Sequence, residues 1–502
     1  MNSIVRRTSR QFSQSNRMGR VYKTKRVRDL LNSYFIFYFS QFDFLIDRID
    51  SLAEKSRKLL GDRVFFGLLK STMGRQFTAG ESLEEALPVV NKLQEDGFHI
   101  ALNYMAEFIK ERNDPSQLDV NLQRYLNTFS MKAHLPGKDF FNAVKLSALI
   151  DFDLLKEVNK RQVFLESLFF KHFDKTAIEL GNLELPKVKL AESIKEVLPD
   201  ATDAEINEFL ELVSLPESKN LAKISLIEWR LSANCYNTLN EEILRNAVYR
   251  KLVNYSNQQE IEIQQFVRRI DQIVQAAKKQ DCFVLADAEQ SYLQFAINNF
   301  VEQMMYLHNT NHHKPVIFNT VQNYLIGSGR YIRYELAKVE FFGPEYPVAL
   351  KLVRGAYLDE EINLTKRTGI DVVYTKKIDT DNNYNANCEA IVQKMTPISR
   401  LVVATHNRDS VYQIADIIEK RLPSSRLADL VYFASLYGLN EPLGYMCIDR
   451  GFKAVKYLPY GEKEIILPYL LRRGKESKQL IKHDKDQLEI IRKELLDRIK
   501  FR

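Results

Sequence analysis

The segment Lys351-Leu-Val-Arg-Gly-Ala-Tyr357 places two cations, a glycine and an aromatic ring at the end of a strand-like run. The residues before it, Pro347-Val-Ala-Leu350, are apolar and favour a strand. Gly355, followed by Ala356, would allow the backbone to approach a flat group closely. We therefore expect an active-site loop after a strand of a parallel barrel. The alternative is a strand that simply ends in solvated cations.

A second group of cations occurs late in the chain. The segment Lys456-Tyr-Leu-Pro-Tyr-Gly461 is followed by a helical run that contains the adjacent residues Arg472 and Arg473. Two neighbouring guanidinium groups repel each other, and a helix tolerates them best when both contact an anion. The pair therefore predicts a binding site for a carboxylate.

Five motifs, in this chain order, are similar to those of the proline dehydrogenase family, and most of all to its monofunctional mitochondrial type. The resemblance covers the chain from about Leu60 to Glu476, apart from one insertion. The motifs are Ala143–Ala148 (AVKLSA), Leu285–Gln290 (LADAEQ), Lys351–Tyr357 (KLVRGAY), Ala404–Asn407 (ATHN) and the YLPYG…LPYLLRR segment that ends at Arg473.

The resemblance implies an FAD-dependent oxidation of L-proline to Δ1-pyrroline-5-carboxylate, the first step of proline catabolism. It also implies a quinone as electron acceptor, on the matrix side of the inner mitochondrial membrane, with peripheral attachment to that membrane. Two alternatives stay open: a hydroxyproline dehydrogenase, and a catalytically inactive barrel that acts as a binding protein. Tyr457 would discriminate the first, because the hydroxyproline branch resembles this pocket with a smaller residue there.

The resemblance assigns a substrate pocket and two catalytic residues, Asp287 and Lys351. Arg472 and Arg473 would hold the proline carboxylate, with Lys145 as a third cation that pairs with Asp287. Tyr457 would pack on the pyrrolidine ring. The expected substrate contacts are Lys145, Asp287, Leu436, Tyr457, Arg472 and Arg473.

The flavin contacts are expected by the same resemblance. Lys351 falls where a cation near flavin N5 is expected, and a positive charge there stabilises the reduced ring. Ser435 and Leu439 depart from the glutamine and methionine usual in the family, which removes one hydrogen bond expected to FAD. The expected cofactor contacts are Ala288, Gln322, Lys351, Val353, Arg354, Gly355, Ala356, Thr405, His406 and Glu476.

The positive net charge belongs to the N-terminus. Residues 1–28 contain nine Lys or Arg and no acidic residue, so removing them from the net charge of +7 leaves −2 for the rest. This Arg-rich, acid-free composition predicts a mitochondrial transit segment, with a basic tail as the alternative. The remaining charge gives no reason to expect nucleic-acid binding.

The four cysteines are dispersed and no HExxH motif is present, so no metal is expected and the cysteines are interpreted as buried. Residues Leu30–Ile46 are rich in aromatic side chains but too polar for a membrane span. They could pack as a helix on the barrel or lie along a membrane face, and packing is the simpler interpretation.

The alternation of strands and helices predicts an α/β fold, a distorted (β/α)8 TIM-type barrel, with an open doubly wound sheet as the alternative. Seven strand-like runs are visible, from Asn142–Leu149 to Ala454–Tyr457. The predicted order is an N-terminal helical region (29–139), a first barrel strand (140–150), a helical insertion after it (151–270), the remaining FAD-binding barrel (271–477) and a C-terminal helix (478–502).

Within the insertion, Ala201–Ala233 resembles the EF-hand-like insertion of some mitochondrial proline dehydrogenases. Its loop, Leu215–Ser225, lacks the regularly spaced oxygen ligands and the central glycine that calcium needs. A degenerate EF-hand without calcium is therefore expected.

Overall fold

The structure is a computed structural model that describes residues 20–23, 25–105, 115–173, 183–233, 241–310, 313–421, 429–483 and 486–500. Most of the predicted transit segment, residues 1–19, and Cys235 lie outside these ranges. Cys282, Cys388 and Cys447 are buried and unpaired, as expected.

Within these ranges, eight parallel strands close a barrel in the order β1-β10-β9-β8-β7-β6-β5-β2. The strands are short and almost wholly buried, as expected when helices cover a parallel sheet. This confirms the TIM-type barrel and excludes the open sheet. The strands are β1 His99–Tyr104, β2 Phe140–Val144, β5 Phe283–Ala286, β6 Ile317–Gln322, β7 Ala349–Val353, β8 Arg400–Ala404, β9 Val431–Leu436 and β10 Lys453–Tyr460.

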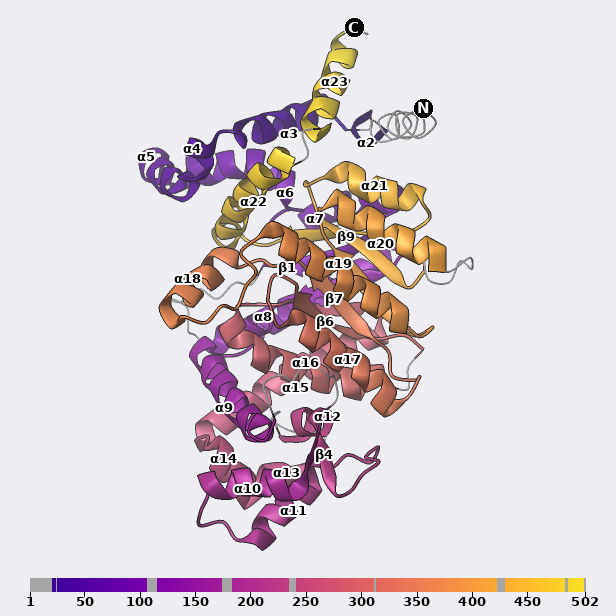
Figure 1. Cartoon of the computed structure of the whole chain (residues 1–502). Helices are drawn as coiled ribbons and strands as arrows, with labels where there is room; N and C mark the ends of the chain where they lie inside the picture. Colours follow the sequence, from indigo (N-terminus) through magenta and orange to yellow (C-terminus); the bar gives the residue numbers. More distant parts are fainter. Residues whose placement is uncertain are drawn as a thin grey trace.

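Helices surround this barrel (Figure 1). Helix α7 begins where the sequence predicts, because Ser82 caps it by accepting from the Glu85 N–H at 3.4 Å. The barrel helices are α7 Leu83–Glu95, α8 Pro115–Thr128, α15 Asn257–Lys279, α16 Ser291–Asn309, α17 Ser328–Phe342, α18 Leu358–Thr368, α19 Lys377–Lys394, α20 Arg408–Arg421, α21 Glu441–Asp449 and α22 Lys463–His483.

One boundary in the predicted order is wrong. The segment 29–139 was expected to be helical, yet its residues His99–Tyr104 form β1, which pairs with both β2 and β10. The strand at 140–144 is therefore the second barrel strand, and the insertion follows the second strand. All six residues of β1 are buried, so the run has no polar alternation that could distinguish it from a buried helical turn.

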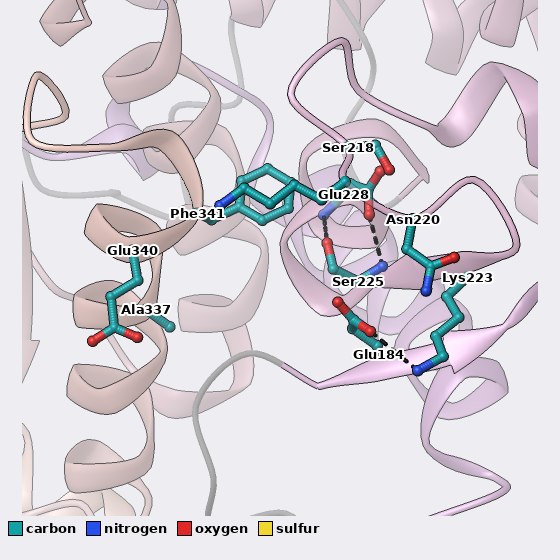
Figure 2. Close-up of a pocket in the computed structure, with 10 residues that line it drawn as sticks. Glu184, Ser218, Asn220, Lys223, Ser225, Glu228, Ala337, Glu340 and Phe341 are labelled. Carbon is teal, nitrogen blue, oxygen red and sulfur yellow. Dashed lines mark hydrogen bonds and ion pairs between the residues drawn. The ribbon is translucent and has the colours of Figure 1, made fainter.

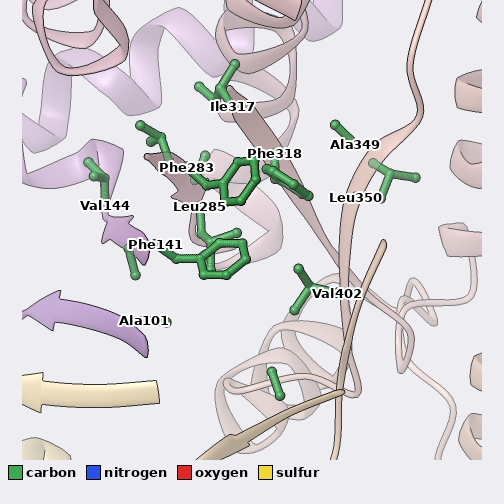
Figure 3. Close-up of a cluster of buried hydrophobic side chains, with 14 of the residues drawn as sticks. Ala101, Phe141, Val144, Phe283, Leu285, Ile317, Phe318, Ala349, Leu350 and Val402 are labelled. Carbon is green, nitrogen blue, oxygen red and sulfur yellow. The ribbon is translucent and has the colours of Figure 1, made fainter. Parts of the chain in front are cut away.

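Aromatic rings fill the barrel interior. Phe141 stacks on Phe283 with ring centroids 4.8 Å apart, and Phe318 meets Phe283 edge to face at 5.5 Å (Figure 3). The Tyr432 ring lies 5.1 Å from Phe141. This plug of rings makes the barrel a packed core, and leaves only its mouth for a ligand.

The insertion forms a separate lobe with its own hydrophobic core, which includes the wholly buried Trp229. Figure 1 shows this lobe below the barrel. Trp229 donates its indole N–H to the Leu165 carbonyl at 3.1 Å, which joins two segments of the lobe that are far apart in the chain. Its elements are α9 Phe152–Phe170, β3 Glu184–Pro186, α10 Lys187–Val197, α11 Asp203–Val213, β4 Lys223–Ser225, α12 Leu226–Glu228, the π-helix Trp229–Ala233, α13 Glu241–Arg245 and α14 Ala247–Val253.

The EF-hand-like loop is closed by protein groups. The buried Glu228 carboxylate accepts the backbone N–H groups of Ser225 at 2.8 Å and Leu215 at 3.3 Å. If Glu228 takes the twelfth position of a calcium loop, Lys219 and Leu221 stand at the third and fifth, where calcium needs oxygen ligands. A cavity of about 180 Å³ lies between this loop and α17, beside the Lys223–Glu184 ion pair (Figure 2).

Helices from the two terminal regions of the chain, α3 and α23, lie together above the barrel, and α22 lies beside them (Figure 1). The predicted C-terminal helix at 478–502 needs correction, because α22 continues to His483 and a separate α23 covers Asp486–Lys500. Ile491 of α23 packs with Leu30 and Phe37. The N-terminal helices are α2 Arg20–Lys23, α3 Val27–Phe39, α4 Asp43–Ile46, α5 Ile49–Leu69 and α6 Arg75–Phe77.

The end of the predicted transit segment belongs to the folded body. Val21 and Tyr22 are buried, and the Arg498 guanidinium donates to the carbonyls of Tyr22, Lys23 and Lys25, each at 2.8 Å. The predicted end of the transit segment at residue 28 therefore lies within the folded body. The Lys and Arg residues on which the prediction was based continue past Val21 and Tyr22, where the buried residues begin.

The Leu30–Ile46 segment has two environments. Leu30, Phe37 and Ile46 are buried, as the packing interpretation predicts, whereas Phe35 and Phe39 are about half exposed. In the described part of the chain, no helix has both the length and the hydropathy of a membrane span.

Candidate active site

A cavity of about 620 Å³ opens at the carboxyl ends of the barrel strands. Phe141 and Leu285 lie at its base, and Tyr469 and Arg473 of α22 contribute to its wall. A site at this end of the barrel is what the fold predicts, because the carboxyl ends of parallel strands and the loops that follow them converge there.

Every site residue proposed from the sequence lines this one cavity. Lys145, Asp287 and Thr405 each directly follow a strand, and Arg472, Arg473 and Glu476 come from α22. The set is Lys145, Asp287, Ala288, Gln322, Lys351, Val353, Arg354, Gly355, Ala356, Thr405, His406, Leu436, Tyr457, Arg472, Arg473 and Glu476.

Asp287 is the centre of a buried polar group. Its carboxylate accepts the Lys351 ammonium at 2.6 Å and the Tyr457 hydroxyl at 2.6 Å. The Lys351 nitrogen also lies 5.0 Å from the centre of the Tyr457 ring. Burial, and then the neighbouring Asp287 charge, raise the pKa of Tyr457 well above its usual value, so its hydroxyl stays a donor.

Lys145 lies near a second buried carboxylate. The resemblance pairs Lys145 with Asp287, and that pairing stays a prediction; Lys351 is an ammonium partner that Asp287 has in addition. The charge of Lys145 acts on Glu289, which accepts the N–H of Ser147 at 3.0 Å. Burial raises the pKa of Glu289, and Lys145 opposes that rise.

Helix α22 presents cations and one carboxylate to the cavity. The Arg473 guanidinium pairs with Glu476 and lies 4.6 Å from the centre of the Tyr469 ring. Burial raises the pKa of Glu476 although Arg473 and Arg472 lower it. The Arg473 Nε is buried and has no hydrogen-bond partner among the described residues. It therefore offers a donor to an anion in the cavity.

His406 provides a neutral ring at the cavity wall. Burial, with help from the Lys456 and Arg473 charges, lowers its pKa to about 3. Its Nε2 accepts the Leu436 N–H at 3.3 Å, so the neutral ring must carry its proton on Nδ1. In the described part of the chain this buried Nδ1 meets no acceptor, which leaves one N–H available to a ligand.

Two expected cofactor contacts use their polar atoms within the protein. The Gln322 amide donates to the Glu289 carbonyl at 2.7 Å and accepts the Ala356 N–H at 3.1 Å. Arg354 donates to Thr405 at 2.9 Å and Ser410 at 2.7 Å. These residues shape the wall by holding its loops together.

The glycine in the KLVRGAY motif has a packing reason. Gly355 has φ of +148°, and a Cβ there would lie 1.2 Å from Cδ1 of Tyr324. The flat group that its backbone approaches is therefore the Tyr324 ring of the protein.

Ser435, which departs from the family pattern, belongs to a buried network. Its hydroxyl accepts the Lys456 ammonium at 3.0 Å, and Lys456 also pairs with Glu441 at 3.2 Å. Lys456 is wholly buried. Ser435 therefore stabilises a buried cation beneath the cavity wall.

Sequence reasoning missed Lys377, Arg408, Asp409 and Tyr469 of the cavity lining. It also missed two buried polar residues there, Asn103 and Thr320. Both are almost wholly buried, and neither Asn103 Oδ1 nor Thr320 Oγ1 finds a hydrogen-bond partner within the described ranges. Asn103 was missed with its strand, β1. The only sequence signal for Asn103 and Thr320 as site residues was that each is a polar residue within a strand-like apolar run. Polar residues also occur at strand positions that have no function.

Curated relatives align with nearly the whole chain at low identity. Proline dehydrogenase 1, mitochondrial, from Drosophila melanogaster is 24% identical over 555 residues, which covers 95% of this chain and 79% of the relative. Hydroxyproline dehydrogenase from Xenopus laevis is 25% identical over 487 residues, which covers 96% of this chain and 89% of the relative.

The fold has counterparts among solved structures. Proline utilization A from Bdellovibrio bacteriovorus, inactivated by N-propargylglycine, superposes with a TM-score of 0.56 at 18% identity. The match covers 93% of this chain, which spans only 41% of that longer protein. The family model described as proline dehydrogenase matches residues 86–482, and the chain thus belongs to the proline dehydrogenase family of oxidoreductases.

Proposed function

We propose that the protein oxidises L-proline to Δ1-pyrroline-5-carboxylate, with FAD held in the barrel cavity. The observation that carries this proposal is the meeting of two charged groups in one cavity of about 620 Å³. One is the Asp287–Lys351–Tyr457 group of the barrel strands, and the other is the Arg472–Arg473 pair of α22. Membership of the proline dehydrogenase family supports the reaction type.

The carboxylate of proline would bind at α22. The Arg473 Nε offers a buried donor, Arg472 lines the same cavity, and Lys145 adds a third cation. Charge-assisted hydrogen bonds to a carboxylate are roughly twice as strong as neutral ones, and burial strengthens them further. A substrate that lacked the carboxylate would lose these charge-assisted hydrogen bonds.

The pyrrolidine ring would pack on Tyr457 and Leu436. The hydrogen bond from Tyr457 to Asp287 holds the phenol ring in one orientation. Because the pKa of Tyr457 is raised, this bond persists across physiological pH. A fixed ring, rather than a mobile one, would select the orientation of the substrate.

The residues present fit FAD. The Nδ1–H of His406 and the Thr320 hydroxyl are buried, unpartnered among the described residues, and suited to the polar edge of a flavin. Lys377 and Arg408 bring cations to the cavity lining, where they suit a diphosphate. When bound, FAD supplies a hydride acceptor for the carbon next to the proline nitrogen.

Lys351 would favour the negative charge that develops during reduction, as the resemblance implies. Asp287 neutralises part of the positive charge of Lys351. The ion pair would therefore act as an oriented dipole at the mouth of the barrel. Tyr469, Arg473 and Glu476 would exclude water from the reacting atoms.

Proline is favoured over hydroxyproline because the Tyr457 ring is held in place and crowds any group at the 4-position. An inactive barrel is disfavoured because Lys145, Asp287, Lys351, Arg472 and Arg473 are all present around one cavity.

A membrane quinone is proposed as the electron acceptor, with the protein attached peripherally to the matrix side of the inner mitochondrial membrane. The support is the name of the Drosophila melanogaster relative, which is mitochondrial, and the cationic composition of residues 1–28.

The test is the visible absorption spectrum of the purified protein before and after anaerobic proline. Oxidised-flavin bands should be present, should bleach with proline, and should pass into solution on denaturation, because FAD is proposed to bind without a covalent link. A colourless protein that gains no bands from added FAD would overturn the proposal.

A further inference from the structure

Helix α3 is apolar on two opposite faces. Leu30, Ser33 and Phe37 face the body, whereas a second row of apolar residues at spacings of three and four faces solvent. Phe35 is 52% exposed and Phe39 is 50% exposed. We call the exposed row, with its continuation into α4, the aromatic stripe: Val27, Leu31, Phe35, Tyr38, Phe39, Phe42 and Phe44.

The rings of the aromatic stripe contact one another. Phe35 and Phe39 stack with centroids 6.5 Å apart, and Tyr38 meets Phe42 edge to face at 5.5 Å. Phe44, which is 65% exposed, continues the row at 6.2 Å from Phe42. A contiguous row of large exposed rings is unusual for a surface that faces only water.

The N-terminal helices that include the stripe also carry unneutralised positive charge. All six acidic residues between Val27 and Leu69 are ion-paired, and they are Asp29, Asp43, Asp47, Asp50, Glu54 and Asp62. Four exposed cations have no ion-pair partner among the described residues: Arg28, Arg48, Lys55 and Arg63. The segment thus combines exposed rings with unneutralised cations.

Helix α4, which carries the end of the stripe, and the following helix α5 contact α22, the helix that lines the active-site cavity. Lys475 pairs with Asp50 at 2.7 Å, and Lys478 pairs with Asp43 at 3.1 Å. A Cβ on Gly474 would lie 2.6 Å from Ile49, so α22 and α5 are in close contact. The stripe therefore sits one helix layer away from Arg472 and Arg473.

We propose that the aromatic stripe docks onto an anionic lipid bilayer, with helices α3 and α4 lying in the plane of the membrane–water interface. Rings that enter the acyl boundary and cations that meet lipid phosphates are the two features of such helices. This inference rests on the proposed function, because a quinone acceptor dissolved in the membrane requires the cavity to approach it. A second copy of the chain is the alternative occupant, which sedimentation velocity distinguishes below.

The first experiment uses tryptophan as a probe of depth. The chain contains one tryptophan, the wholly buried Trp229, so a Phe39→Trp variant adds one exposed reporter. Vesicles of phosphatidylcholine and phosphatidylglycerol that contain brominated lipid should quench this reporter. The matched control is Val188→Trp, at a 70% exposed site in the insertion lobe, which should not be quenched. Equal quenching of the two, or none of either, would overturn the proposal.

The second experiment separates docking from chemistry in the full-length protein. The variant Phe35→Ser/Phe39→Ser/Phe42→Ser should bind the same vesicles with an apparent affinity at least roughly tenfold lower, measured by co-sedimentation. Its proline oxidation with a soluble dye should stay normal, while reduction of a vesicle-embedded quinone should fall. The matched control is Val188→Ser/Val197→Ser/Leu221→Ser, three exposed residues of the insertion lobe. Normal vesicle binding by the aromatic variant would overturn the inference. A wild-type protein that does not oxidise proline with the soluble dye would overturn the proposed function instead.

The third experiment tests charge. Arg48→Gln/Lys55→Gln should weaken vesicle binding by roughly fivefold for each cation removed. The control is Lys278→Gln/Lys279→Gln, two exposed lysines at the end of α15. Sedimentation velocity gives the remaining outcome: a wild-type dimer that becomes a monomer in the aromatic variant, without any vesicle binding, would assign the stripe to a second copy and overturn the proposal.

Discussion

The Lys351 ammonium lies 2.6 Å from the Asp287 carboxylate, although 64 positions separate the two residues in the chain. Asp287 follows β5 and Lys351 lies within β7, and these strands are separated by β6 in the barrel. Both side chains therefore reach across the barrel mouth, and Tyr457 of β10 joins them there. This contact joins two opposite charges at the barrel mouth, on the same cavity that Arg472 and Arg473 of α22 line.

Lys351→Met should destabilise the protein, because it leaves the Asp287 carboxylate buried without its cation. Removal of one member of a buried pair costs about 3–5 kcal/mol of unfolding free energy. Adding Asp287→Asn should recover part of that loss, because the unpaired charge is then absent. Urea unfolding of the two single variants and the double variant measures the coupling.

The exposed Arg57–Asp62 pair serves as the control, since its side chains are 45% and 63% exposed. Arg57→Met should change stability little. Equal effects at the two pairs would contradict the burial argument.

Arg472→Met and Arg473→Met should each raise the KM for proline and leave bound flavin largely intact. Loss of one charged hydrogen bond to a buried carboxylate costs about 1.5–3 kcal/mol, or roughly 10- to 150-fold in kcat/KM. Steady-state kinetics and the flavin content of each variant provide the measurement. The control is Lys475→Met, whose side chain lies on the same helix but pairs with Asp50. Unchanged kcat/KM in both arginine variants would show that proline binds elsewhere.

Tyr457→Ser should shift the preference from proline toward trans-4-hydroxyproline. The change removes the ring that would cover proline, at an expected cost of about 1–3 kcal/mol in its transition-state binding. Hydroxyproline should lose much less, or gain. Tyr457→Phe is the companion variant, because it keeps the ring and removes only the hydrogen bond to Asp287. If kcat/KM for the two amino acids keeps the same ratio in Tyr457→Ser, the ring does not touch the substrate.

His406 should make the folded state less stable in acid. Its folded pKa is lowered to about 3 from 6.5, mainly by burial. The unfolded chain takes up a proton on this imidazole as the pH falls below 6.5, and the folded chain does not. Stability is therefore lost as the pH falls from 6.5 toward 3, by at most about 1.4 kcal/mol for each pH unit.

His406→Gln should remove this part of the acid sensitivity. Thermal unfolding at pH 7.5 and pH 5.5 measures it, with the exposed His134→Gln as control. A wild-type slope that His406→Gln leaves unchanged would argue against a buried neutral ring.

Residues 1–19 should direct import into mitochondria when fused to a fluorescent reporter, and their removal should leave proline oxidation intact. Removal of residues 1–28 should lower the melting temperature, because Val21, Tyr22 and the carbonyls that Arg498 contacts are lost. Fluorescence microscopy and thermal unfolding test the two halves. A cytosolic reporter, or equal stability of the two truncated proteins, would contradict this boundary.

The sequence determined which residues meet in the cavity. Each motif joins an apolar run to polar residues, and a parallel barrel brings all such strand ends to one face. The resemblance to the proline dehydrogenase family assigned Lys145, Asp287, Lys351, Thr405 and Tyr457 to one site before their distances were known. The cationic N-terminal segment and the Ser82 cap of α7 depend only on neighbouring residues, so composition and spacing were enough to predict them.

Tertiary structure decided what depends on distances through space. Three contacts join residues that are far apart in the chain, and spacing along the chain does not encode them. They are the Asp287–Lys351 ion pair, the hydrogen bond from Lys456 to Ser435, and the packing of Gly355 on Tyr324. Strand β1 escaped prediction because burial of all its residues removes the alternation that identifies a strand. The two faces of α3 carry the same residue types, so only packing decided that Phe37 is core and Phe39 faces solvent.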